Sequence, residues 1–288
     1  MTKPEVSIVL PSIRPHKLCG IYDSIIHAAK KTSFELIVVG PYPLPDGLKD
    51  KKNIKYVEDY GSPVRASNIG ASIAEGKILT WIADDGFLLE DTLDENIDIL
   101  YSHGNSIKNV LVSKYYENQI GPINGEKFDP SRNDHRNHVI ESAPSSHPTL
   151  QEKYYKINNA DCTRSPYIPD DWWIFNVAFM YREFFEFLGG WDSEFEGTAM
   201  SHTDMAIRAQ FNGANVVMAE KPLFVCDHLP GDTGDHQPIF LCQTLHDEPL
   251  IQAKYRDPLW TSKVNTRINV DNWKKAPAIW GRRFNNEV

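Results

Sequence analysis

Short apolar runs alternate with amphipathic segments through the first third of the chain. Four of these runs predict buried strands, because they are continuous, rich in β-branched residues, and followed by turn-forming or acidic residues. The strands are expected at Val6–Leu10, Phe34–Gly40, Ile54–Asp59 and Ile78–Ala83.

Two helices are expected between these strands. Apolar residues recur at three- and four-residue intervals within His16–Lys31 and form one stripe. The segment Ser67–Glu75 is also helical in pattern, with Gly76 as its C-terminal stop. Alternating strands and helices predict an α/β fold with a mostly parallel central sheet and helices on both faces. Ligands of such sheets bind beyond the carboxyl ends of the strands, where Pro11-Ser12, Gly40-Pro41, Glu58-Asp59 and Asp84-Asp85 fall.

The middle of the chain has a weaker pattern. From Asn118 to Pro169 it is polar and rich in Asn, His, Ser and Pro, which predicts long loops that contribute to an acceptor pocket. Apolar character returns at Asp171–Met180, where Trp172 and Trp173 offer faces for sugar rings or simply join the core. A short helix is expected over Arg182–Leu188, with a break at the two glycines that follow.

Further along, a helix is expected to begin near Thr203 and to end at Gly213. Strands are expected at Asn215–Ala219 and near Leu223–Cys226. Beyond about Asp235 no periodicity is evident, so this segment is expected to pack back on the preceding domain.

Composition and charge narrow the classes of function. The 288 residues suffice for a substantial core and are interpreted as a domain over residues 1–235 with a C-terminal extension over residues 236–288. A net charge of -9 argues against an extended nucleic-acid surface. No apolar run approaches the roughly 20 residues that span a bilayer, and no basic leader is evident, so we expect no transmembrane segment and a cytoplasmic location. The cysteines have no CxxC spacing and suggest neither a zinc site nor a disulfide framework.

The first candidate for chemistry is the pair Asp84 and Asp85, directly after the run ILTWIA. Adjacent carboxylates repel each other unless a cation or ordered donors offset their charge. Mg²⁺ or Mn²⁺ would do so, since these ions bind through one or two carboxylates plus substrate phosphates. The alternative is a plain turn, because Asp-Asp-Gly is a common turn sequence.

Several longer segments occur in a fixed order. After an opening strand that ends in Pro-Ser come RASNIGASIAEGKILTWIADDG and, later, NVAFMYREFFEFLGGWDSEFEGTAMSHTDMAIRAQFNG. This succession resembles the family 2 glycosyltransferases of the GT-A fold, a Rossmann-like fold of nucleotide-diphospho-sugar transferases. The resemblance covers roughly Glu5 to His228. It implies a metal-dependent, inverting, hexosyltransferase-type enzyme that uses Mn²⁺ or Mg²⁺, a nucleotide-sugar donor, and a glycan or other hydroxyl acceptor.

The resemblance also assigns individual positions. Asp85 falls where family members bind the metal on the sugar-nucleotide diphosphate, and Asp84 falls closer to the ribose. Gly189 to Gly197, GGWDSEFEG, resembles the segment that shapes the acceptor side. Glu58 is an alternative to Asp59 beside the base. The residues placed in the nucleotide pocket are Pro11, Ser12, Arg14, Asp59, Arg65, Asn68 and Asp84.

The catalytic base is less clearly assigned. Family members usually carry Glu-Asp-x-Asp-Leu where this chain has SHTDMAIR, which puts His202 at the position of the base. Histidine is the commonest general base, with a pKa near 6.5. Asp204 retains the family's second acid and is the other candidate. A purely structural alternative places His202 in the first turn of a helix that Asp204 caps or stabilises.

Two further features concern the ligands. Family members often have Asp-Asp-Gly-Ser after the second strand, where this chain has GPYPLPDG, so a base other than uracil, or a contact from Asp59, has to be considered. His228 resembles the late histidine that completes metal coordination in GT-A enzymes, although a structural role is equally open. His236 and His246 are weaker candidates.

Other classes of protein remain as alternatives. A nucleotidyltransferase would share the sheet and the metal-bound carboxylates, but no Gly-rich phosphate loop follows the first strand. A non-catalytic sugar- or nucleotide-binding relative would keep the fold and lose the catalytic base. The presence of His202 where family members usually carry an acid is compatible with such a protein. A metal-dependent hydrolase is least favoured, because no two histidines have a spacing such as HExxH.

Overall fold

The computed structural model describes residues 3–118, 157, 163–169, 171–227, 236–256 and 270–284. Four parallel strands open the chain and confirm the strands predicted there, to within two residues at each end. They are β1 (Val6–Pro11), β2 (Phe34–Gly40), β3 (Ile54–Glu58) and β4 (Ile78–Trp81).

These strands belong to a sheet of eight, in the order β3-β2-β1-β4-β7-β6-β8-β5, within the part of the chain described. The remaining strands are β5 (Gly86–Leu88), β6 (Asn109–Asn118), β7 (Ala178–Tyr181) and β8 (Asn215–Asp227). β7 is antiparallel to both of its neighbours, β4 and β6, and β5 is antiparallel to β8. The other pairings are parallel, so the predicted α/β class with a mostly parallel sheet is confirmed.

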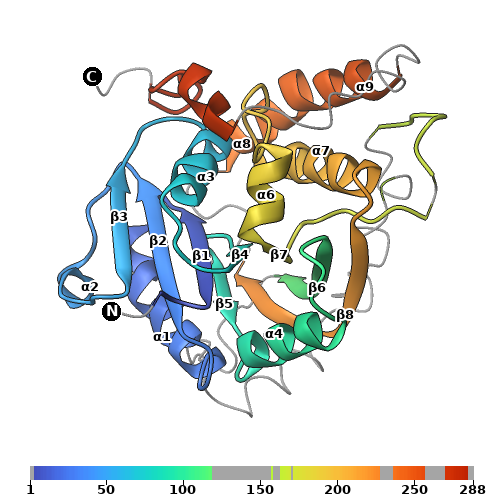
Figure 1. Cartoon of the computed structure of the whole chain (residues 1–288). Coiled ribbons are helices and arrows are strands. Elements are labelled where there is room, and N and C mark those ends of the chain that lie inside the picture. The colour runs from blue at the N-terminus through green and yellow to red at the C-terminus, as the bar shows by residue number, and fades with distance from the viewer. Residues whose placement is uncertain are drawn as a thin grey trace.

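Helices cover both faces of the sheet (Figure 1). In that view α3 and α6 lie in front of the strands and α1 lies behind them. α3 packs on β1 and β2, α6 on β4 and β7, and α4 on β6 and β8. The α-helices are α1 (Leu18–Ala28), α2 (Asp46–Lys49), α3 (Pro63–Ser72), α4 (Thr92–Ser102), α6 (Arg182–Leu188), α7 (Thr198–Phe211), α8 (Gln237–Cys242) and α9 (Glu248–Arg256).

The starts of two helices differ from the prediction by four or five residues, for local reasons. α3 begins at Pro63 rather than Ser67, because the Ser62 hydroxyl caps it by accepting from the Arg65 N–H at 3.2 Å. α7 begins at Thr198 rather than near Thr203, and the carboxylate of Asp247 accepts the two N–H groups just before it. α6 was predicted with its observed bounds, and it ends where Gly189 takes a left-handed φ of 86°.

The later part of the chain is more regular than its pattern suggested. β8 is one continuous strand where two were expected. Where no periodicity was evident, the structure has α8, a π-helix over Gln243–Asp247 and α9, and a 3₁₀ helix over Val270–Lys275. The loops expected between Asn118 and Pro169 lie mostly outside the described residues.

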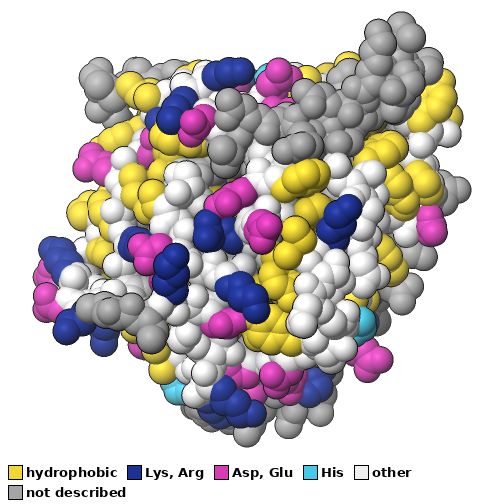
Figure 2. All heavy atoms as spheres, in the orientation of Figure 1, with side chains coloured by type: hydrophobic (Ala, Val, Ile, Leu, Met, Phe, Trp, Pro, Cys, Tyr) yellow, Lys and Arg dark blue, Asp and Glu magenta, His cyan; other side chains and the backbone are white. Residues whose placement is uncertain are grey.

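The surface carries charges of both signs. On the face shown in Figure 2, Lys and Arg side chains are interspersed with Asp and Glu and form no continuous basic area among the residues described. No helix in the described ranges has both the length and the apolar character needed to cross a membrane.

Candidate active site

A cavity of about 560 Å³ opens at the carboxyl ends of β1, β2 and β4, within the 300–1,000 Å³ typical of ligand pockets. Residues from the strand ends, from α7 and α8, and from the C-terminal segment line it together. The predicted site residues among the lining are Pro11, Ser12, Arg14, Asp59, Asp84, Asp85 and His202. The strand-end positions expected to meet a ligand therefore do face one pocket.

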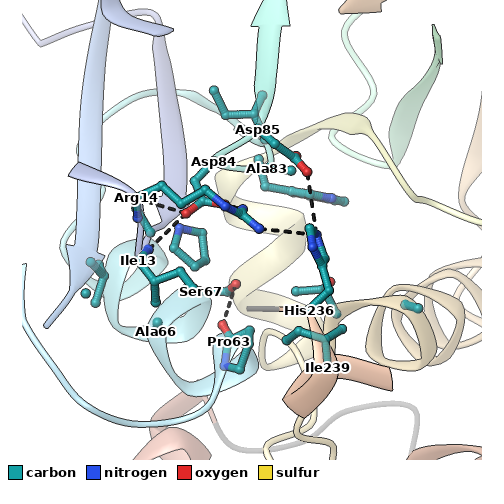
Figure 3. Close-up of a pocket in the computed structure, with 18 of the residues that line it drawn as sticks. Ile13, Arg14, Pro63, Ala66, Ser67, Ala83, Asp84, Asp85, His236 and Ile239 are labelled. Atoms are coloured by element: carbon teal, nitrogen blue, oxygen red, sulfur yellow. Dashed lines mark hydrogen bonds and ion pairs between the residues drawn. The ribbon is translucent and has the colours of Figure 1, made fainter. Parts of the chain in front are cut away.

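Asp84 is held by donors from the loop after β1 (Figure 3). Its carboxylate forms an ion pair with Arg14 and accepts from the Ile13 N–H at 2.9 Å and from the Ser12 hydroxyl at 3.2 Å. Burial raises the pKa of Asp84 and the adjacent Asp85 adds to the rise, while the Arg14 charge opposes it. Ordered donors thus offset much of the repulsion expected between the two carboxylates.

Asp85 points across the pocket toward His236, at the start of α8 (Figure 3). The Oδ2 atom of Asp85 lies 3.8 Å from Nε2 of His236, and the same Nε2 lies 3.2 Å from Nη2 of Arg14. Because a guanidinium can only donate, Nε2 has to be the acceptor, which assigns the proton of neutral His236 to Nδ1. The Nε2 lone pair is therefore directed to Arg14, and the Asp85 carboxylate lies 3.8 Å from the same nitrogen.

These two groups are compatible with a divalent cation. Ligand atoms about 2.1 Å from Mg²⁺ lie about 3.0 Å apart in neighbouring octahedral positions and about 4.2 Å apart in opposite ones. Asp85 and His236 could therefore share one ion after a small movement of their side chains, once Nε2 has released Arg14. The described residues contain no cluster of three or more His, Cys, Asp and Glu side chains suited to a metal. Any ion would then need a substrate or water for its other ligands, as Mg²⁺ sites with phosphates do.

His202 lies inside α7 and lines the pocket next to two tryptophans. Its ring centroid is 5.5 Å from that of Trp81 and 6.1 Å from that of Trp191. The side chain is nearly buried, and burial lowers its pKa to about 3. The imidazole is therefore neutral at physiological pH and can accept a hydrogen bond.

Asp204, the other candidate base, lies away from the pocket. Its side chain has no exposed surface and does not line the pocket among the described residues. Its oxygens bind Arg208 Nε at 2.7 Å, Lys254 Nζ at 2.7 Å and the Tyr255 hydroxyl at 2.6 Å. Burial alone would raise the pKa of Asp204, but the charges of Lys254 and Arg208 lower it to about 2. Asp204 is the centre of a buried ion network that joins α7 to α9.

Two residues predicted to lie in the nucleotide pocket form hydrogen bonds elsewhere in the protein. Asn68 binds the backbone of Trp191 through both its amide nitrogen and its oxygen, at 2.8 and 3.0 Å. Arg65 binds Asp59 at 3.0 Å and two carbonyls of the C-terminal segment. Neither appears among the described residues that line the cavity. Asp59 does line it, with its carboxylate also bound by the N–H of Gly61 at 2.9 Å.

Some of the lining was not expected from the sequence. His228, the expected metal ligand, lies outside the described residues, and His236 was only a weaker candidate. Trp280, Arg283 and Phe284 join the pocket from a segment without periodicity. No local signal marks these three, because contacts across more than 200 positions of sequence bring them to the strand ends.

No protein-family model matches the sequence, and no curated protein matches it. Among solved structures the chain is similar to the crystal structure of S. aureus TarS 1–349, with 14% identity over 91% of this chain and 73% of that chain and a TM-score of 0.48. The same protein in complex with UDP-GlcNAc matches with 13% identity over 87% and 71% of the two chains and a TM-score of 0.47.

A second protein among these structures comes from Drosophila. The catalytic domain of beta1,4galactosyltransferase 7 in complex with xylobiose matches with 13% identity over 93% of this chain and 83% of that chain, with a TM-score of 0.48. Both similarities extend over most of the chain at low identity. The chemistry of the pocket therefore has to be inferred from the chain's own side chains.

Proposed function

We propose that the chain is a metal-dependent, inverting glycosyltransferase of the GT-A type, which transfers a sugar from a nucleotide-diphosphate donor to an acceptor hydroxyl. One observation carries the proposal: Arg14, Asp84, Asp85, His236 and His202 converge on a single cavity at the carboxyl ends of parallel strands. Such strand ends are where α/β sheets bind nucleotides. The motif order described for family 2 glycosyltransferases supports the same assignment.

The donor would bind at the end of β4. Arg14 offers a positive charge for the diphosphate, and Asp84, which it orients, is placed to accept from a ribose hydroxyl. A divalent cation held by Asp85 and His236 would supply charge compensation for the diphosphate as it leaves. His228, predicted from the sequence as a metal ligand, lies outside the described residues, and the proposal uses His236 because it lies close to Asp85.

The acceptor would bind on the side of His202. The hydroxyl oxygen of the acceptor forms a bond to the anomeric carbon of the donor sugar, while the bond from that carbon to the diphosphate oxygen breaks. The hydroxyl proton passes to the neutral imidazole of His202. Because the pKa of His202 is about 3, the imidazole does not retain the proton readily, so its transfer has to accompany bond formation.

The low pKa of His202 also favours a second candidate function, a sugar- or nucleotide-binding protein without transferase activity. A buried imidazole with a pKa of about 3 is a weak base compared with an ordinary histidine. Such a protein would bind the donor and leave it intact. Release of free nucleoside diphosphate from a donor therefore separates the two candidates.

The test uses the whole chain with a panel of nucleotide sugars, candidate glycan acceptors and Mn²⁺, and measures release of free nucleoside diphosphate with and without a chelator. We expect release for at least one donor, its loss with chelator, and a fall of at least about 100-fold in Asp85→Asn. Asp46→Asn, the same change at an exposed position, is the matched control and should keep full activity. Binding of a donor without any release would favour the binding protein, and no binding of any nucleotide would contradict both.

A further inference from the structure

The nitrogen Nε2 of His236 accepts a hydrogen bond from Arg14 beside the carboxylate of Asp85 (Figure 3). Nη2 of Arg14 lies 3.2 Å from this nitrogen, and Oδ2 of Asp85 lies 3.8 Å from it. A neutral imidazole has one accepting nitrogen with one lone pair, and a cation bound by His236 needs that same lone pair. The hydrogen bond from Arg14 and a bond from Nε2 to a cation therefore exclude each other.

Several contacts hold Arg14 in this position. Its Nη1 forms an ion pair with the carboxylate of Asp84, and its backbone N–H donates to the hydroxyl of Ser12 at 3.2 Å. The side chains of Arg14 and Asp84 are 11% and 10% exposed, so water competes little with the ion pair. Low exposure also leaves the repulsion between the guanidinium and a nearby divalent cation poorly screened. In the free protein, Arg14 therefore opposes a cation at His236 in two ways.

A diphosphate offers Arg14 a better partner than His236. A guanidinium forms strong, frequently bidentate pairs with phosphate oxygens, which carry negative charge, whereas Nε2 of His236 is a single neutral acceptor. The guanidinium has five N–H donors in a fork, so Arg14 can keep Asp84 through Nη1 while Nη2 turns from His236 to a phosphate. That change returns the lone pair of Nε2 to a cation.

We propose that Arg14 couples cation binding to nucleotide binding. In the free protein it occupies the lone pair of His236 and keeps the affinity for the cation low, and a bound nucleoside diphosphate draws it away and completes the cation site. The inference rests on the proposed function. Arg14 acts here as a positioning residue, because it affects the cation through His236. The coupling is reciprocal, so the cation also tightens the binding of the nucleotide.

Mn²⁺ binding to the whole protein, followed by electron paramagnetic resonance, tests this inference. Without nucleotide, we expect His236→Ala to change the affinity of the otherwise wild-type protein for Mn²⁺ by less than about twofold, because Arg14 already occupies Nε2. Arg14→Met, which has no side-chain N–H, should bind Mn²⁺ alone at least about tenfold more tightly. Adding His236→Ala to Arg14→Met should cancel most of this gain.

The same measurement with UDP or GDP gives the complementary result. In the protein that retains Arg14, His236→Ala should now weaken Mn²⁺ binding at least about tenfold, because the nucleotide has released Nε2. His236 would thus contribute to the cation only when a nucleotide is present or Arg14 is absent.

Arg283→Met is the matched control for the charge of Arg14. Arg283 also lines the cavity, and its guanidinium carbon lies 5.9 Å from the centroid of the Trp280 ring. If Arg14 acted through its charge alone, the gain in Arg14→Met would persist after His236→Ala, and Arg283→Met would show a gain of the same kind. We expect Arg283→Met to change the affinity for Mn²⁺ alone by less than about threefold.

The outcomes separate the inference from the function on which it rests. No gain in Arg14→Met, or a gain that is equal with and without His236, would overturn the coupling and leave the metal-dependent transferase standing. Absence of Mn²⁺ binding to the wild type with both UDP and GDP would overturn the inference and the metal-dependent function together. Thermal unfolding shows whether each variant is folded. Arg14→Lys keeps the charge for Asp84 with one nitrogen in place of two, and it tests the same gain if Arg14→Met does not fold.

Discussion

His202 combines a place in the pocket with a strongly lowered pKa. Its carbon and nitrogen atoms are packed beside Trp81 and Trp191, so a proton on the ring would lack water. An imidazole that must stay neutral in the folded protein makes folding depend on pH. The dependence is specific to this side chain and can be measured without any substrate.

Above about pH 6.5 this imidazole is neutral in both the folded and the unfolded chain and does not change the stability. Between that pH and about pH 3, this imidazole is protonated in the unfolded chain and neutral in the folded chain. The free energy of unfolding should therefore fall by up to roughly 1.4 kcal/mol per pH unit through His202 alone. Urea denaturation at about pH 7, 6 and 5 should show a shallower fall for His202→Gln than for the wild type. His103→Gln, at an exposed position, is the control, and identical slopes in all three proteins would contradict the prediction.

Asp204 is the second residue whose environment decides its role. It is bound by two cations and a tyrosine hydroxyl with no exposed surface. We expect Asp204→Ala to lower the free energy of unfolding by about 3–5 kcal/mol, because the buried Arg208 would lose its carboxylate partner and Lys254 would keep only Asp192. Asp46→Ala, at an exposed surface pair, should change it by less than about 0.5 kcal/mol. A loss of activity in Asp204→Ala with unchanged stability would contradict the structural role and restore Asp204 as a candidate base.

Most of the candidate site residues predicted from the sequence line the pocket, and the others that the structure describes make contacts with distant parts of the chain. Ser12, Arg14, Asp84 and Asp85 follow strands whose apolar runs are local, and parallel strand ends meet at one edge. Nothing in the local sequence predicts the buried network around Asp204, because Lys254 and Tyr255, which bind it, lie about 50 positions further along the chain. Pairing at that distance leaves no periodic pattern.

Among the elements, the strands were predicted best and the helix starts less well. A buried strand is defined by its own apolar run, whereas a helix start depends on which group caps it. Ser62 caps α3 from the adjoining residue, but the groups before α7 are capped by Asp247 from a different helix. The α8 to α9 region escaped prediction because it is short, partly π-helical and exposed on much of its surface.

The approach of β1 and β2 at their carboxyl ends depends on a glycine. A Cβ atom on Gly40 would lie 1.8 Å from the carbonyl oxygen of Ser12, well inside contact distance. We expect Gly40→Ala to force these strand ends apart, to lower stability by about 1–3 kcal/mol or more, and to weaken nucleotide binding because Ser12 orients the site. Thermal unfolding and nucleotide titration measure the two effects. Gly47→Ala is the matched control, since its Cβ would meet only Cys19 Sγ at 3.6 Å, and equal behaviour of the two variants would contradict the prediction.

In the molecule as a whole, residues after 236 are integrated with those before it through charged contacts. Lys254 reaches Asp192 and Asp204, and Arg65 reaches the carbonyls of Trp273 and Ala276. The division at residue 235 drawn from the sequence stays a prediction about domains. These contacts nevertheless show that the later segment contributes to the packing around the pocket.

Loss of the Arg65 contacts should loosen one part of the molecule selectively. In Arg65→Leu we expect amide hydrogen exchange over residues 271–284 to speed up at least about tenfold, because two carbonyl contacts and the stacking on Trp273 disappear. Exchange in β1 and β2 should stay as in the wild type. Lys274→Leu, which removes an exposed charge from the same segment, is the control. Equally faster hydrogen exchange throughout the chain would contradict the prediction that Arg65 stabilises this segment alone.

The position of β7 in the sheet has a consequence for how the chain reaches its native state. β7 completes the hydrogen bonding of both β4 and β6, although Tyr181 and Ile78 are about 100 positions apart. Before residues 178–181 are synthesised, β4 has one unpaired edge and β6 has two, because β8, the other neighbour of β6, begins only at Asn215. Unpaired edges with apolar side chains are surfaces on which chains aggregate. Pairing over such a distance in the sequence favours slow folding, and it leaves these edges open to aggregation until β7 and β8 are both in place.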